Sequence, residues 1–77
     1  MLESVREAIN EVLVESGRAP LESLSAETNL RVDVGLDSLD LAELTVRIEF
    51  RHGVDVFSDG VIVETVGEII QRIESKS

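Results

Sequence analysis

The sequence contains no cysteine, tryptophan or tyrosine, and only one proline, one histidine and two phenylalanines among its 77 residues. Without cysteine the chain forms neither a disulfide nor a thiolate metal site, so any thiol chemistry has to arrive on a prosthetic group. The single histidine, His52, has no second histidine or cysteine with which to form a catalytic or metal-binding set, and we interpret it as a packing or capping residue.

Basic residues are also scarce, with seven Lys and Arg against 16 Asp and Glu and a net charge of −9. This balance argues against nucleic acid and anionic membrane surfaces as partners. It favours basic protein partners, although charge alone does not distinguish docking from simple solubility. The first residues lack the order of a signal peptide, and no apolar run is long enough to span a membrane. We therefore expect a soluble, cytoplasmic monomer that does not insert into membranes.

Apolar residues make up 43% of the chain, mostly Leu, Val, Ile and Ala, which is enough for a core in one small domain spanning residues 1–77. Apolar residues recur at three- and four-residue steps over 2–16, which predicts an amphipathic helix that ends at Gly17. Residues 17–37 show no helical period. We predict a long ordered crossover there, with a turn of helix around 21–24.

A second helix is predicted over residues 38–52, with Asp37 as its N-cap, Asp40 at its third position and Gly53 as its stop. An extended link over 54–57 and a single helical turn over 58–63 should follow. Thr65 and Glu68 fit a capping box for a last helix, from Val66 to about Ser75. The sequence therefore predicts an all-α protein, a small four-helix bundle with three main helices, one short helix and a long first loop.

The second helix has two apolar stripes, although a surface helix needs only one. At 100° per residue, one stripe contains Leu41, Leu44, Thr45, Ile48 and His52, and the nearly opposite one contains Leu39, Ala42, Val46 and Phe50. Either the helix is buried all round, or the second stripe is an exposed docking patch. We favour docking for Leu39, and both interpretations stand for Phe50.

The run Leu30-x-x-Asp33-Val34-Gly35-Leu36-Asp37-Ser38-Leu39-Asp40 resembles the signature of acyl carrier proteins. The resemblance extends over nearly the whole chain, including its length, its acidity, the long first loop and the glycine fifteen residues after the serine. In that family the serine of Asp-Ser-Leu carries 4′-phosphopantetheine. The resemblance implies that Ser38 is the attachment residue and that the chain shuttles thioester-bound groups without being an enzyme.

The same resemblance implies partners. These are a phosphopantetheinyl transferase and acyl-transferring, condensing or ligase-type enzymes with basic docking surfaces, in fatty-acid, polyketide or related biosynthesis. The positions that match the family's partner-binding residues are Asp37, Leu39, Asp40, Glu43 and Val46, and Ala42 and Phe50 fall on the same face.

Some residues depart from the pattern of fatty-acid carriers. Arg47 and Arg51 are positive where many of those carriers are neutral or acidic, Phe50 replaces an acid, and His52 replaces a Phe. We interpret Arg47, Phe50 and Arg51 as residues that tune partner choice, so a specialised polyketide, lipid or aminoacyl pathway competes with the general fatty-acid one. Asp37 argues against the Gly-Gly-x-Ser pattern common in peptidyl carriers.

Other interpretations of the motif remain. Ser38 could be an ordinary first-turn residue, and the chain an unmodified acidic adaptor that binds through its second apolar stripe. The aspartates at 33, 37 and 40 do not form a calcium loop, because Leu36 and Leu39 stand where ligands are needed. Ser38 and His52 would lie roughly 20 Å apart at opposite ends of one helix, which argues against a hydrolase.

Overall fold

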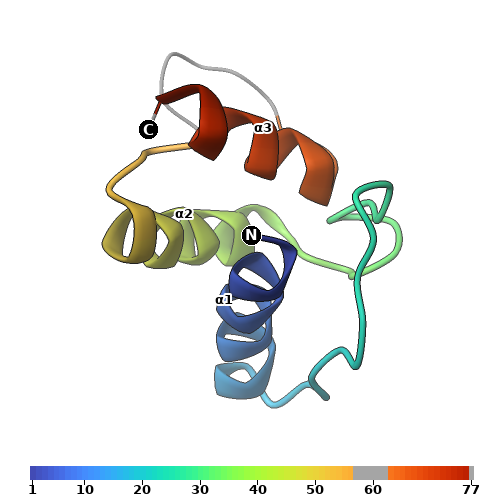
Figure 1. Ribbon diagram of the computed structural model, residues 1–77. Helices are drawn as coiled ribbons and strands as arrows, with labels where there is room; N and C mark the ends of the chain where they lie inside the picture. The colour runs from blue at the N-terminus through green and yellow to red at the C-terminus, as the bar shows by residue number, and fades with distance from the viewer. Residues whose placement is uncertain (57–62, 77) are drawn as a thin grey trace.

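The computed structural model describes residues 1–56 and 63–76, and its regular elements are three helices. They are α1 (Leu2–Glu15), α2 (Ser38–His52) and α3 (Val66–Lys76). As Figure 1 shows, a long loop connects α1 to α2, and α3 lies above α2 at the top of the view. The all-α prediction is confirmed, but the short helical turn predicted over 58–63 falls almost entirely outside the described residues. Within the described part of the chain, no helix is long and apolar enough to cross a membrane.

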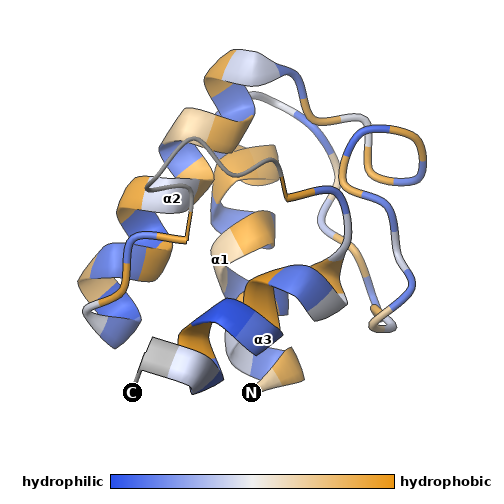
Figure 2. Ribbon diagram, turned by 90° about the horizontal axis from the view of Figure 1, so that it is seen from above, coloured by the Kyte–Doolittle hydropathy of each residue, from blue (hydrophilic) through white to orange (hydrophobic). Residues whose placement is uncertain are grey.

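The hydrophobic core forms where α1 packs against both α2 and α3. Figure 2 shows hydrophobic and hydrophilic residues alternating along each helix, as expected of helices with one buried face. From α1 the fully buried residues include Val5 and Ile9, from α2 Leu44 and Ile48, and from α3 Ile69. The central position of α1 is what holds α2, and therefore the start of α2, in place.

The helix ends follow the predicted local signals. Helix α1 ends at Glu15, one residue earlier than predicted, and Gly17 follows in a left-handed conformation with φ of 82°. At the start of α3, Thr65 Oγ1 accepts a hydrogen bond from the Glu68 N–H at 3.3 Å. Glu68 Oε2 in turn accepts one from the Thr65 N–H at 3.2 Å, which confirms that capping box.

The first loop differs from the prediction over 21–24, where the helical turn is wrong. Asn10 on α1 accepts a hydrogen bond from the Leu21 N–H at 2.7 Å and donates one to the Leu21 carbonyl at 3.0 Å. Arg6 donates a second bond to the same carbonyl. Both backbone groups of Leu21 are therefore bound to α1 and cannot enter a local helix. The loop instead turns at 26–27 and 30–33.

The same loop is attached to the start of α3 and to the segment just before it by three backbone hydrogen bonds. The Leu30 N–H donates to the Glu64 carbonyl at 2.8 Å, the Val66 N–H to Thr28 at 3.0 Å, and the Gly67 N–H to Ala26 at 2.8 Å. Since the first N–H groups of a helix have no partner within it, the loop satisfies two donors at the start of α3. Leu30 and Leu36 of the loop are buried, and Leu21, Leu24 and Val34 pack partly buried against the core, which confirms that the crossover is ordered.

Candidate functional site

Ser38 is the first residue of α2, and its side chain is exposed. The preceding residue, Asp37, is the N-cap and has extended backbone angles. Its Oδ1 accepts a hydrogen bond from the Asp40 N–H at 2.8 Å, and Asp40 Oδ2 accepts one from the Asp37 N–H at 3.1 Å. Because this reciprocal capping box occupies Asp37 and Asp40, Ser38 is not needed as a cap. Its hydroxyl has no hydrogen bond to any described residue.

The backbone at this point is suited to a phosphate group. The N–H groups of Ser38 and Leu39 make no hydrogen bond within the described part of the chain. They lie at the positive end of the α2 dipole, which favours a negative charge. The carboxylates of Asp37 and Asp40 oppose that attraction, because they carry negative charge. The exposed hydroxyl and the two free N–H groups fit a solvated phosphodiester, which is the linkage that a phosphopantetheine arm requires.

Arg18, just beyond the end of α1, contacts residues on both sides of Ser38. Its Nη2 donates to Asp40 Oδ2 at 2.7 Å, its Nη1 to the Gly35 carbonyl at 3.1 Å, and its Nε to Ser16 Oγ at 2.8 Å. The Arg18 hydrogen bond, followed by the bond from the Asp37 backbone, lowers the pKa of Asp40 below its ordinary value. Sequence reasoning missed Arg18, since nothing local at position 18 indicates a partner 22 residues away.

The loop immediately before Ser38 is held by its own anchors. Leu36 is buried, and its N–H donates to the Leu30 carbonyl at 2.9 Å. Gly35 has φ of 84°, a left-handed conformation that side-chain-bearing residues rarely adopt. This glycine therefore allows the chain to turn from the buried Leu30 region into the exposed start of α2.

The outer apolar stripe of α2 is exposed. Leu39, Val46 and Phe50 have exposed fractions of 74%, 67% and 92%, and Ala42 is exposed as well. The interpretation of α2 as buried all round is therefore wrong. It failed because only the opposite stripe, where Leu44 and Ile48 are fully buried, faces α1 and the core.

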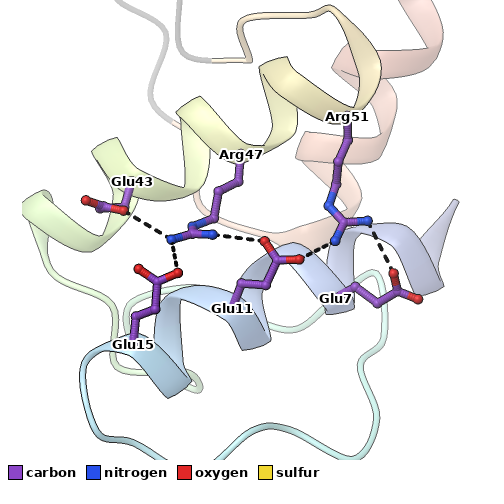
Figure 3. A network of polar contacts seen from close by, with 6 residues as sticks. All are labelled: Glu7, Glu11, Glu15, Glu43, Arg47 and Arg51. Atoms are coloured by element: carbon purple, nitrogen blue, oxygen red, sulfur yellow. Dashed lines mark hydrogen bonds and ion pairs between the residues drawn. The ribbon is translucent and has the colours of Figure 1, made fainter.

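Arg47 and Arg51 point across to α1 and form a ladder of ion pairs with it (Figure 3). Arg47 Nη1 lies 2.9 Å from Glu11 Oε1, and Nη2 contacts Glu15, with Glu43 at 3.6 Å. Arg51 pairs with Glu7 at 3.2 Å and with the second oxygen of Glu11. The residues of this α1–α2 ladder are Glu7, Glu11, Glu15, Glu43, Arg47 and Arg51. Both arginines singled out from the sequence therefore bind carboxylates of their own chain.

A groove of about 490 Å³ runs beside the ladder, lined by Glu11, Glu43, Val46, Arg47, Phe50 and Arg51. It joins the exposed apolar stripe to the charged ladder. The structure thus brings the predicted partner-binding residues of α2 onto one side of the molecule, with Asp37 and Leu39 at the Ser38 end and Phe50 and Arg51 at the other.

His52 lies at the far end of α2 from Ser38, where its Nε2 is 2.9 Å from the Ser4 hydroxyl. It therefore joins the end of α2 to the first turn of α1, which agrees with its interpretation as a packing residue. Among the described residues, no group of three or more His, Cys, Asp and Glu side chains is arranged to hold a metal ion.

Comparison with known proteins bears directly on the helix start. The family model described as "Phosphopantetheine attachment site" matches residues 3–73. An acyl carrier protein of Saccharopolyspora erythraea is 39% identical over 66 residues, covering 84% of this chain and 70% of the relative. "Acyl carrier protein 3" of Ralstonia nicotianae is 32% identical over 73 residues, covering 94% and 84%.

A third relative, an acyl carrier protein of Wolinella succinogenes, is 31% identical over 68 residues, covering 87% of this chain and 90% of its own. No solved structure gives a significant match. The family match over most of the chain confirms the resemblance noted in the sequence. The chain therefore belongs to the acyl carrier protein family: it is a carrier and not an enzyme, and its prosthetic group is covalently attached 4′-phosphopantetheine.

Proposed function

We propose that Ser38 is the attachment residue and that the chain delivers acyl or related groups, bound as thioesters, to enzymes of fatty-acid, polyketide or related biosynthesis. One observation supports this most strongly: an exposed serine stands at the first position of α2 while its neighbours Asp37 and Asp40 form the cap. A hydroxyl that makes no hydrogen bond to any described residue is available for covalent modification.

The prosthetic group supplies the thiol that a chain without cysteine lacks. The protein determines where the attachment residue, Ser38, is placed. The capping box fixes the start of α2, buried Leu36 anchors the preceding loop, and the exposed side chain of Ser38 is accessible to a large modifying enzyme. In the described part of the chain no side chain is arranged with Ser38 as a general base, so the transferase has to provide the acid–base chemistry of attachment.

The test is modification with coenzyme A and a broad-specificity phosphopantetheinyl transferase. Transfer forms a bond between Ser38 Oγ and phosphorus, breaks the diphosphate bond of coenzyme A, and releases 3′,5′-ADP and a proton. The intact mass should rise by one phosphopantetheine group in the wild type and in Ser23→Ala, a control at another exposed serine. It should stay unchanged in Ser38→Ala. A mass gain in Ser38→Ala, or none in the wild type, would refute the assignment.

We further propose that the exposed face of α2 is the docking surface for the transferase and for the acyl-transferring, condensing or ligase-type enzymes. This docking surface consists of the exposed residues Asp37, Leu39, Ala42, Glu43, Val46 and Phe50 and, at its edge, the partly buried Asp40. An apolar centre with an acidic rim is suited to a transient contact with a basic partner. Arg47 and Arg51 contribute by fixing α2 against α1, and through that contact they affect which partners fit.

Docking is tested with Phe50→Asp beside Val32→Asp, which places the same charge at another exposed apolar residue, on the first loop. Phe50→Asp should raise the KM for the cognate enzyme at least tenfold, while Val32→Asp stays near the wild type. Equal effects from the two variants would contradict the docking surface. If Ser38→Ala kept full biological activity and Phe50→Asp lost it, the unmodified adaptor would be the better description.

The curated relatives are named as acyl carriers, which supports an acyl cargo over an aminoacyl or peptidyl one. The intact mass of the protein from its source, before and after thioester cleavage by hydroxylamine, identifies the cargo. Hydroxylamine releases the cargo as its hydroxamate and leaves the free thiol of the arm, and an amino-acid hydroxamate among the products would exclude the acyl assignment.

A further inference from the structure

We propose that Arg18 is a positioning residue for the modification of Ser38, an inference that rests on the function proposed above. The guanidinium group of Arg18 binds the chain on both sides of the serine. It donates to the carbonyl of Gly35, three residues before Ser38, and to the carboxylate of Asp40, two residues after it. A third bond, to Ser16 Oγ, fixes the guanidinium to the end of α1.

The contact with Asp40 supports the capping box. Asp40 Oδ2 accepts hydrogen bonds from two donors, the Asp37 N–H at 3.1 Å and Arg18 Nη2 at 2.7 Å. Arg18 therefore holds the carboxylate in the orientation that caps the helix. The planar guanidinium reaches the Gly35 carbonyl at the same time through a second nitrogen, which the single ammonium group of lysine reproduces poorly. The side chain of Arg18, which lies outside the segment 35–40, therefore holds that segment together with Ser38.

The same contact changes the charge next to the serine. The carboxylates of Asp37 and Asp40 flank Ser38, and the diphosphate of coenzyme A has to approach them during attachment. The positive charge of Arg18 offsets the charge of Asp40 at 2.7 Å, which reduces the repulsion of the incoming phosphate. Removing Arg18 should therefore slow the reaction through both position and charge.

These effects can be separated from folding. Arg18 lies outside the helices, and its side chain is 36% exposed, so its removal opens no cavity in the core. Arg31 offers a matched control on the same loop, because it is exposed and its side chain makes no ion pair with a described residue. Arg18→Gln and Arg31→Gln remove the same charge, but only the first removes the contacts around Ser38.

The experiment measures the kinetics of phosphopantetheinyl transfer from coenzyme A with the full chain as substrate. For Arg18→Gln we expect kcat to fall about tenfold and the KM for the carrier to change less than twofold, since misplaced reacting groups cost up to about 100-fold in rate. Arg31→Gln should match the wild type. Arg18→Lys keeps the charge but loses the simultaneous contact through two nitrogens, so its kcat should lie between those of Arg18→Gln and the wild type.

Rates are corrected for the folded fraction of each variant, measured by circular dichroism. The proposal is overturned if Arg18→Gln reacts like the wild type, if only its KM changes, if the loss disappears after this correction, or if Arg18→Lys reacts at the full rate. If the wild type itself gained no mass, the assignment of Ser38 would fail, and the Arg18 proposal with it. That result is distinct from an active wild type beside an equally active Arg18→Gln.

Discussion

At the scale of single residues, the start of α2 depends on Asp37. Asp37→Ala removes the acceptor for the Asp40 N–H, and loss of an N-cap costs about 1 kcal/mol in free energy of unfolding. Asn caps a helix about as well as Asp, so Asp37→Asn should stay within a few tenths of a kcal/mol of the wild type. Urea denaturation at pH 7 measures both variants. Equal stability of the Ala and Asn variants would show that the cap contributes nothing.

Residues whose partners are close in sequence were the ones that could be predicted. Asp37 with Asp40, Thr65 with Glu68, and the stop at Gly53 depend on neighbours within four residues, and the structure confirms each. Two of the three partners of Arg18 lie 17 and 22 residues away, and the partner of Asn10 lies 11 away. Such contacts depend on the tertiary path of the first loop, which no local pattern encodes.

At the scale of helices, the α1–α2 ladder fixes the pair that carries the docking surface. Arg47→Gln removes contacts with three glutamates and should lower the free energy of unfolding by about 1 kcal/mol, the upper end for partly exposed ion pairs. The effect is modest because the buried Arg47 Nε has no hydrogen-bond partner among the described residues, which offsets part of the gain.

Salt provides the control for this prediction. At 1 M NaCl, where the screening length is about 3 Å, the difference between Arg47→Gln and the wild type should shrink markedly. Arg31→Gln removes the same charge without breaking an ion pair to any described residue and should show little difference at either salt concentration. A difference for Arg47→Gln that stays constant from low to high salt would indicate lost packing of its aliphatic stem instead.

The contact of the first loop with α3 gives a second prediction at this scale. A Cβ atom on Gly67 would lie 2.9 Å from the Ala26 carbonyl oxygen and 3.2 Å from the Ala26 Cβ. Helix propensity alone would make Gly67→Ala stabilising by up to about 1 kcal/mol. Overpacking costs about 1–3 kcal/mol, and here the obstacle is backbone, so we expect net destabilisation.

Thermal unfolding of Gly67→Ala tests the sign of this effect. Gln71→Ala, at an exposed position of the same helix, should leave the melting temperature close to that of the wild type. A higher melting temperature for Gly67→Ala would mean that the loop moves aside at no cost.

Helical periodicity predicted where the helices lie but not which stripe of α2 faces inward. On a wheel the stripe of Leu44 and Ile48 and the stripe of Val46 and Phe50 are both apolar, and the choice depends on where α1 and α3 pack. Ser38 was predicted as the candidate site because its motif is local. The exposure of Phe50 and the ladder of Arg47 and Arg51 needed the assembled bundle.

At the scale of the whole molecule, acid has two opposite effects on a chain with a net charge of −9. Protonation of carboxylates without a cation partner relieves repulsion and favours the folded state. Protonation of paired carboxylates removes attraction. The pairs with Arg51 and then Arg47 lower the pKa of Glu11, and Arg18 lowers that of Asp40, so these two groups belong to the second class.

For such a group the folded-state pKa lies below the unfolded one. Its stabilisation is complete above the ordinary values of 4.5 for Glu and 3.8 for Asp, and is lost as the pH falls through the lower folded value. Arg51→Gln should therefore be less stable than Arg31→Gln at pH 7, and the gap should close as the pH falls below 4.5 and through the lowered pKa of Glu11. Both variants remove one positive charge, so general repulsion is matched and the closing of the gap reports the pairing of Arg51 with Glu11. Denaturation curves of both variants, measured from pH 7 down through this range, test the prediction. A gap that does not shrink as the carboxylates are protonated would mean that Arg51 stabilises the bundle through packing and not through its charge.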